Sequence, residues 1–154
     1  MYSLDNLWDG LGAILINHPE VKFMFGKITM YRDFDPLARD LVLFFLNRYF
    51  PDKDKLLTPL EPLKIVTSQK VLKSIFTGDN YDEDYRILIQ KVRSLNENIP
   101  PLVNAYMNLS STMRTFGTSM NKFFGNVEET GILITAEDIY DIKKDRHLGT
   151  YSKK

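Results

Sequence analysis

Three charged residues near the end of the chain could bind a substrate and transfer a proton. Arg114 lies in one β-like segment, and Glu128 and Glu129 lie in the turn-rich stretch that leads into the next. A guanidinium can hold the carboxylate of a small substrate through two parallel hydrogen bonds, and a glutamate can take a proton from an amine. The alternative interpretation is an ion pair across a hairpin, which contributes little to stability.

The remaining residue types that do chemistry are scarce. The chain has two histidines and no cysteine. His18 precedes Pro19 at the end of a predicted helix, and His147 falls in a polar tail. Without cysteine, and without paired histidines at helical spacing, we expect no metal site, no disulfide and no thiolate nucleophile. The absence of cysteine also fits a cytoplasmic protein.

The first fifty residues predict a helix, a strand and a second helix. Apolar residues recur at three- and four-residue steps from Ser3 until His18-Pro19 ends the pattern. The run 21–31 is rich in aromatic and β-branched residues, so we expect a strand buried on both faces over part of its length. Asp35 as N-cap and Pro36 at the first helical position start the next helix. This order predicts an α/β (α+β) layer structure with a mixed sheet flanked by helices.

The second half adds helices and a hairpin. The expected elements are a loop over 52–65, short helices over 68–75 and 101–109, a helix over 81–95, strands over 113–120 and 130–135, and a last helix over 136–147. The two strands predict a hairpin with a long, structured loop that contains Gly125-Asn126. We expect one domain over 1–142 and a basic polar tail over 143–154.

Composition excludes several classes of protein. The 154 residues suffice for one domain, and a 44% apolar and 26% charged composition is that of an ordinary globular protein. Lys and Arg balance Asp and Glu at 20 each, which by itself favours neither answer on nucleic-acid binding. No basic surface of the kind that binds phosphate dominates the chain, so we expect no nucleic-acid partner. No apolar run approaches the roughly 20 residues that span a bilayer, and the N-terminus does not resemble a signal peptide.

Several long strings together resemble a known family. They are LDNLWDGLGAIL, FMFGKITMYRDFDPLARDLVLFFLNRYFPD and IPPLVNAYMNLSSTMRTFGTSMNKFFGNVEETGILI. In this order they are similar to the hemolysin-like branch of the GNAT N-acyltransferases, and the similarity runs from about Leu4 to Tyr140. The resemblance implies transfer of a fatty acyl group from acyl carrier protein, or from CoA, to the amine of glycine or ornithine in aminolipid synthesis. Acyl carrier protein or acyl-CoA would be a co-substrate, and no cofactor would be bound permanently.

The resemblance also implies roles for particular residues. GNAT enzymes transfer the acyl group directly, and a tyrosine near the splayed strand often protonates the departing thiolate. Tyr31, at the end of the 21–31 strand, is the nearest match, and Arg32 beside it is a candidate substrate contact. The alternative for Tyr31 is a packed tyrosine whose hydroxyl is hydrogen-bonded. Within this resemblance, Arg114 would clamp the acceptor's carboxylate, and Glu128 or Glu129 would be the base for its amine.

The resemblance further implies that the N-terminal amides of the first helix, which begins at Ser3, face the phosphate of the phosphopantetheine on acyl carrier protein. Asn6, Trp8 and Gly10 are therefore candidates on the cofactor side. The glycine-rich phosphate loop of typical GNAT enzymes is not reproduced here, and a core position is the more common role for a tryptophan such as Trp8. Glycines such as Gly10 usually indicate close packing or approach of a ligand.

Relatives in this family continue upstream with further strands. The GNAT cleft lies between two splayed strands, of which only the second, over 21–31, is present here. We therefore expect a truncated gene product or a piece of a longer enzyme, and activity of this chain alone stays open. The alternative is a non-catalytic binding module that forms homo-oligomers through an unpaired sheet edge. The basic ending, KKDRHLGTYSKK, could contact anionic lipid at the inner face of the membrane or the acidic surface of acyl carrier protein, or it is simply solvated.

Overall fold

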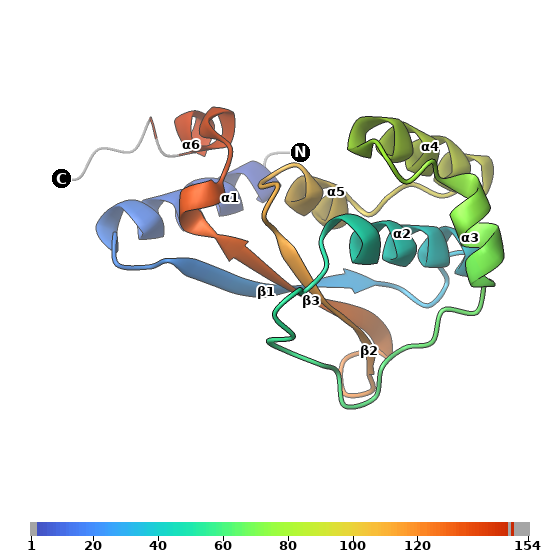
Figure 1. Ribbon diagram of the computed structural model, residues 1–154. Helices are drawn as coiled ribbons and strands as arrows, with labels where there is room; N and C mark the ends of the chain where they lie inside the picture. The colour runs from blue at the N-terminus through green and yellow to red at the C-terminus, as the bar shows by residue number, and fades with distance from the viewer. Residues whose placement is uncertain (1–2, 148, 150–154) are drawn as a thin grey trace.

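The computed structural model describes residues 3–147 and 149. It has an α+β architecture in which a three-stranded antiparallel sheet carries helices on one face (Figure 1). The elements are α1 (Ser3–Asn17), β1 (Phe23–Met30), α2 (Pro36–Tyr49), α3 (Gln69–Ile75), α4 (Tyr81–Ser94), α5 (Pro101–Met107), β2 (Arg114–Asn121), β3 (Val127–Thr135), a 3-10 turn (Ala136–Asp138) and α6 (Asp141–His147).

The central helix α2 starts where the sequence predicts. The carboxylate of Asp35 accepts hydrogen bonds from the backbone N–H groups of Leu37 and Ala38 at 2.8 and 3.0 Å, and Pro36 occupies the first turn. Residues 40–46 are all buried, so nearly the whole circumference of α2 is covered. A helix that is buried all round lies in the core of its domain, here among the sheet and the other helices.

The strands are ordered β1-β3-β2, so the last strand in the chain lies in the middle of the sheet. β1 pairs with β3 from Phe23 opposite Thr135 to Met30 opposite Glu128. Among the described elements, the other edge of β1 has no neighbouring strand. The outer edge of β2 differs, because bridges at Pro51 and Pro62 attach the 51–63 loop to it.

The two faces of the sheet have different environments. Ile28 and Met30 of β1 and Ile132 and Ile134 of β3 are buried beneath the helices. On the opposite face Phe23 and Phe25 are 58% and 60% exposed. The expectation that this strand is buried on both faces over part of its length is therefore wrong. All of the described helices lie on one side of the sheet, so alternate residues of β1 are left uncovered (Figure 1).

The other predicted elements are present with shifted ends. The hairpin of β2 and β3 is confirmed, but β3 begins at Val127 rather than Thr130, so its loop is shorter than expected. Residues 143–147 of the predicted tail belong to α6, which is attached to α1 by a contact of 2.8 Å between the His147 ring and Asp9. The rest of that tail, 148 and 150–154, lies outside the described residues. In the described part of the chain, no helix has the length and apolar character that a membrane crossing requires.

Candidate functional site

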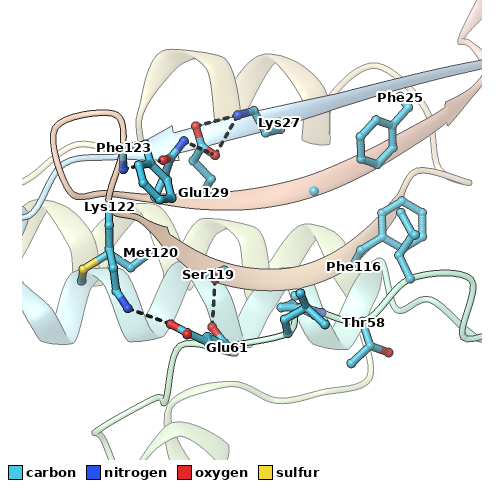
Figure 2. Close-up of a pocket in the computed structure, with 16 residues that line it drawn as sticks. Phe25, Lys27, Thr58, Glu61, Phe116, Ser119, Met120, Lys122, Phe123 and Glu129 are labelled. Carbon is cyan, nitrogen blue, oxygen red and sulfur yellow. Dashed lines mark hydrogen bonds and ion pairs between the residues drawn. The ribbon is translucent and has the colours of Figure 1, made fainter.

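A groove of about 610 Å³ lies on the open face of the sheet, between the strands and the loop 57–61 (Figure 2). The loop is held against β2 by several hydrogen bonds. The Leu63 N–H donates to the Thr118 carbonyl at 2.7 Å, and the Ser119 hydroxyl donates to the Glu61 carbonyl at 2.9 Å. Lys122 forms an ion pair with the Glu61 carboxylate at 2.9 Å, which holds the pKa of that carboxyl below its usual value. The loop is therefore a fixed wall of the groove.

A β-bulge in β2 makes room for this wall. The pairing with β3 shifts between Thr115 and Thr118, and Gly117 within the bulge has a φ of +85°. A Cβ at Gly117 would lie 3.1 Å from Pro59 Cγ in the loop. Glycine is required here because it alone tolerates both the backbone angle and the close approach.

One end of the groove is apolar. The rings of Phe25 on β1 and Phe116 on β2 lie 5.9 Å apart, with Gly131 of β3 between them (Figure 2). A Cβ at Gly131 would lie 3.4 Å from Phe116 Cδ2 and 3.8 Å from Phe25 Cε2. The glycine therefore lets the two rings approach over the middle strand and keeps the floor of the groove smooth.

The other end of the groove carries a charged cluster. Lys27 Nζ of β1 lies 2.8 Å from both carboxylate oxygens of Glu129, and Asn121 Nδ2 donates to the same carboxylate at 3.1 Å. The Glu129 side chain is only 14% exposed, whereas that of Lys27 is 54% exposed. The cluster is thus a nearly covered carboxylate held by an ammonium that still faces the groove.

Arg114 does not join Glu128 or Glu129. Arg114 lies opposite Leu133, whereas Glu129 lies opposite Ser119. The Arg114 guanidinium instead forms ion pairs with Asp54 and, at 4.0 Å, with Asp52. The reason is the antiparallel register, which places the start of β2 beside the end of β3. The hairpin pair weighed as an alternative is therefore also absent.

The structure instead brings Lys27 to Glu129, and sequence reasoning missed this cation. The signal in the sequence is that Lys27 is the charged residue within the mostly apolar run FMFGKITM of β1. A charge in such a run indicates a face that is not covered by other elements.

Glu128 lies on the helix side of the sheet, buried beside the first turns of α2. Arg39 donates to Glu128 Oε1 at 3.0 Å and, through two nitrogens, to Asp40 Oδ1 at 3.0 and 2.9 Å. The other oxygen of Asp40 accepts the backbone N–H groups of Val66 and Thr67 at 3.0 and 2.7 Å. Glu128 Oε2 is buried and has no hydrogen-bond partner.

This buried cluster of Arg39, Asp40 and Glu128 was not predicted from the sequence. Burial by itself lowers the pKa of Arg39, but the hydrogen bond to Asp40 and the charge of Glu128 outweigh it and raise that pKa. The guanidinium is therefore held in its charged form between two buried carboxylates.

Tyr31 and Arg32 follow the end of β1 and do not line the groove. Both are exposed, and the Tyr31 side chain is 68% exposed. The backbone carbonyl of Tyr31 accepts the N–H of Phe34 at 3.1 Å, which closes a turn between β1 and α2. The structure thus places these two residues in the turn that follows β1, outside the lining of the groove.

The three predicted cofactor-side residues lie on α1, on the helix side of the sheet. Trp8 is half-buried, and its ring meets Tyr106 of α5 edge-on at 5.3 Å, so the tryptophan has a packing role. Asn6 is exposed. A Cβ at Gly10 would have no atom within 4 Å, so close packing does not explain this glycine. Within the described residues there is no group of acidic or histidine side chains that could hold a metal ion.

Two curated proteins are similar to nearly the whole chain. The protein named glycine N(alpha)-acyltransferase of Phocaeicola vulgatus is 54% identical over 153 residues, which are 99% of this chain and 47% of that protein. The protein of the same name from Bacteroides thetaiotaomicron is 52% identical over 151 residues, 98% of this chain and 45% of its own length. The chain is homologous to a part of these N-acyltransferases.

The N-acyltransferase relationship expected from the sequence is thereby confirmed. The chain spans about half the length of the curated relatives that it matches. The α+β class is confirmed too, and the sheet with its helices is consistent with part of a GNAT-like fold, but the three described strands pair antiparallel throughout rather than as the mixed sheet expected. No family model and no solved structure matches the chain.

Proposed function

We propose that this chain forms about half of an N-acyltransferase that moves a fatty acyl group onto the amine of a small amino acid such as glycine. The observation that supports this is the 54% identity, over 99% of the chain, to a protein named glycine N(alpha)-acyltransferase. The resemblance to GNAT enzymes suggests acyl carrier protein, or CoA, as the carrier of the acyl group and an aminolipid as the destination of the product.

The reaction joins a thioester and an amine. The amine nitrogen attacks the thioester carbonyl carbon, a C–N bond forms, and the C–S bond breaks. The nitrogen gives up a proton and the departing thiolate takes one up, so the products are an amide and a free thiol. Glu129 is our candidate for the group that accepts the proton, because it lies at an open groove, whereas Glu128 is enclosed beneath α2. Tyr31 stays the candidate proton donor to the thiolate.

The rest of the enzyme would complete the site. The edge of β1 opposite β3 has no partner among the described strands, and Tyr31 follows directly at the end of this strand. An added strand at this edge would bring new residues beside Tyr31 and would satisfy the backbone groups of β1. We therefore expect acyl transfer to need both parts of the enzyme.

A chimera tests this function. The segment of the Phocaeicola vulgatus relative that matches this chain is replaced by the chain itself, and transfer from palmitoyl-acyl carrier protein to radiolabelled glycine is measured. We expect N-palmitoylglycine from the chimera and none from the chain alone. The unmodified relative is the positive control. If that relative forms product while a folded chimera acylates no amino acid, the proposal is wrong.

A second candidate is a non-catalytic module that assembles through its sheet edge. The observation in its favour is the unpaired edge of β1, next to which Phe23 and Phe25 are exposed. Light scattering across a range of concentrations tests it. A dimer that Phe23→Lys dissociates, and that Val71→Lys on the exposed face of α3 leaves intact, would support this candidate. A monomer at high concentration would contradict it.

A further inference from the structure

The two ends of the groove differ in chemistry, as Figure 2 shows. Lys27, Glu129 and Asn121 form the charged cluster at one end, and Phe25 and Phe116 form the aromatic floor at the other. A surface with this pattern suits an amphiphile, because a charged head and an apolar tail each meet a matching environment.

The charged end has unused hydrogen-bonding capacity. A lysine ammonium has three N–H donors, and Lys27 directs its ammonium to the two oxygens of one carboxylate while half of its side chain stays exposed. It can therefore also bind a second carboxylate. Glu129 Oε2 accepts from both Lys27 and Asn121, whereas Oε1 accepts from Lys27 alone and has a further lone pair that can accept an amide N–H.

The apolar end has the shape for a chain rather than a ring system. Gly131 leaves no side chain on the middle strand, so the floor runs between Phe25 and Phe116 without a step. Pro59 and Leu60 line the loop side, and Leu60 is fully exposed at the rim. The volume of about 610 Å³ is that of ordinary small-molecule sites, which range over about 300–1,000 Å³.

We propose that this groove binds the N-acylated amino acid, with its carboxylate on Lys27, its amide N–H on Glu129 and its acyl chain along Phe25, Gly131 and Phe116. The inference rests on the proposed function, because acylation of an amino acid produces a ligand with this head and tail. It assigns to the chain a binding site for a long-chain acyl amino acid.

Direct binding to the 154-residue chain tests the site with three probes, each held at a concentration at which it stays monomeric in solution. They are N-palmitoylglycine, N-acetylglycine with the head alone, and hexadecanol with the tail alone. We expect N-palmitoylglycine to bind most tightly, since it alone meets both ends. Lys27→Met replaces the charged side chain by an apolar one of similar length. It should weaken N-palmitoylglycine about tenfold and leave hexadecanol unchanged.

Gly131→Leu should abolish binding of both probes that carry the long chain, because its side chain fills the floor. Leu60→Asp is a second variant at a fully exposed position that supports no packing, and it should weaken the same two probes several-fold. Lys70→Met, an exposed lysine of α3 outside the groove, is the matched control for Lys27→Met. Thermal unfolding confirms that each variant is folded.

Two results would overturn the proposal. One is an equal affinity of N-palmitoylglycine for the wild type, Lys27→Met and Leu60→Asp; the other is no binding by the folded wild-type chain. Both are independent of the chimera assay. An active chimera whose groove binds no acyl amino acid refutes the site alone, and binding by the chain beside an inactive chimera refutes the proposed function alone.

Discussion

Glu128 and Glu129 are neighbours in the chain, yet their carboxylates lie on opposite faces of the sheet. Glu128 points beneath α2, where Arg39 binds it at 3.0 Å. Glu129 points into the open groove, where Lys27 binds it at 2.8 Å. Successive residues of a strand face opposite sides, so a pair that looks like one functional unit in the sequence is divided between core and surface.

The two glutamates should therefore respond differently to the same substitution. We expect Glu129→Gln to change the free energy of unfolding by less than about 1 kcal/mol, because it weakens a partly exposed ion pair. It should reduce the affinity of the groove for N-palmitoylglycine. Glu128→Gln should destabilise by about 1–3 kcal/mol, since it removes the buried negative charge that Arg39 binds. Urea unfolding and ligand titration of both variants check this, and the reverse pattern would contradict it.

Substitution of Arg39 should lower the free energy of unfolding strongly. Arg39→Met leaves Asp40 and Glu128 buried without their cation, and breaking a buried pair in this way costs about 3–5 kcal/mol. Arg86→Met on the exposed side of α4 is the control, with an expected change within about 0.5 kcal/mol. Urea unfolding measures both. Similar values for the two variants would show that the buried cluster contributes little.

Asp84 couples stability to pH. Its carboxylate accepts hydrogen bonds from the Tyr49 hydroxyl at 2.6 Å, the Thr77 N–H and hydroxyl at 2.7 and 2.8 Å, and the Gly78 N–H at 2.9 Å. Burial alone raises the pKa of Asp84, but these hydrogen bonds outweigh it and lower that pKa. Burial, followed by the contact with Asp84, raises the pKa of Tyr49 to about 12.

The sign of the pH effect follows from this lowered pKa. The stabilisation by Asp84 is complete above the unfolded-state pKa of about 3.9 and is lost as the pH falls through the lower folded-state value. We expect Asp84→Asn to destabilise by about 2–3 kcal/mol at pH 7 and by progressively less below pH ~4. Urea unfolding at several pH values measures the difference in the free energy of unfolding between the wild type and Asp84→Asn. A difference that stays constant down to pH ~2 would contradict this assignment.

Two glycines should give opposite results on replacement by alanine. Gly117→Ala should destabilise by about 1–3 kcal/mol, because its φ of +85° and the nearby Pro59 both oppose a Cβ. Gly10→Ala, in the middle of α1 and facing open space, should stabilise by about 0.5–1 kcal/mol. Thermal unfolding of both variants checks the contrast. Destabilisation by Gly10→Ala would contradict the open surroundings of this glycine.

Most elements could be predicted from local signals, because the causes are local. The N-cap at Asp35 with Pro36, and the break at His18-Pro19, act within one helical turn, and α2 and α1 begin or end where they predict. The environment of the 21–31 strand could not be predicted in the same way. Its apolar residues look alike in the sequence, and only the position of the helices decides which of them are covered.

The sequence by itself determined the α+β class, the places where the main helices start and stop, and the kinship with N-acyltransferases. Only the tertiary structure decided which charges meet. Antiparallel pairing places Lys27 beside Glu129, 102 positions later in the chain, and leaves Arg114 paired with Asp54 instead of with either glutamate. The physical reason is that capping and periodicity act over a few residues, whereas strand register is set by the whole sheet and the helices packed on it.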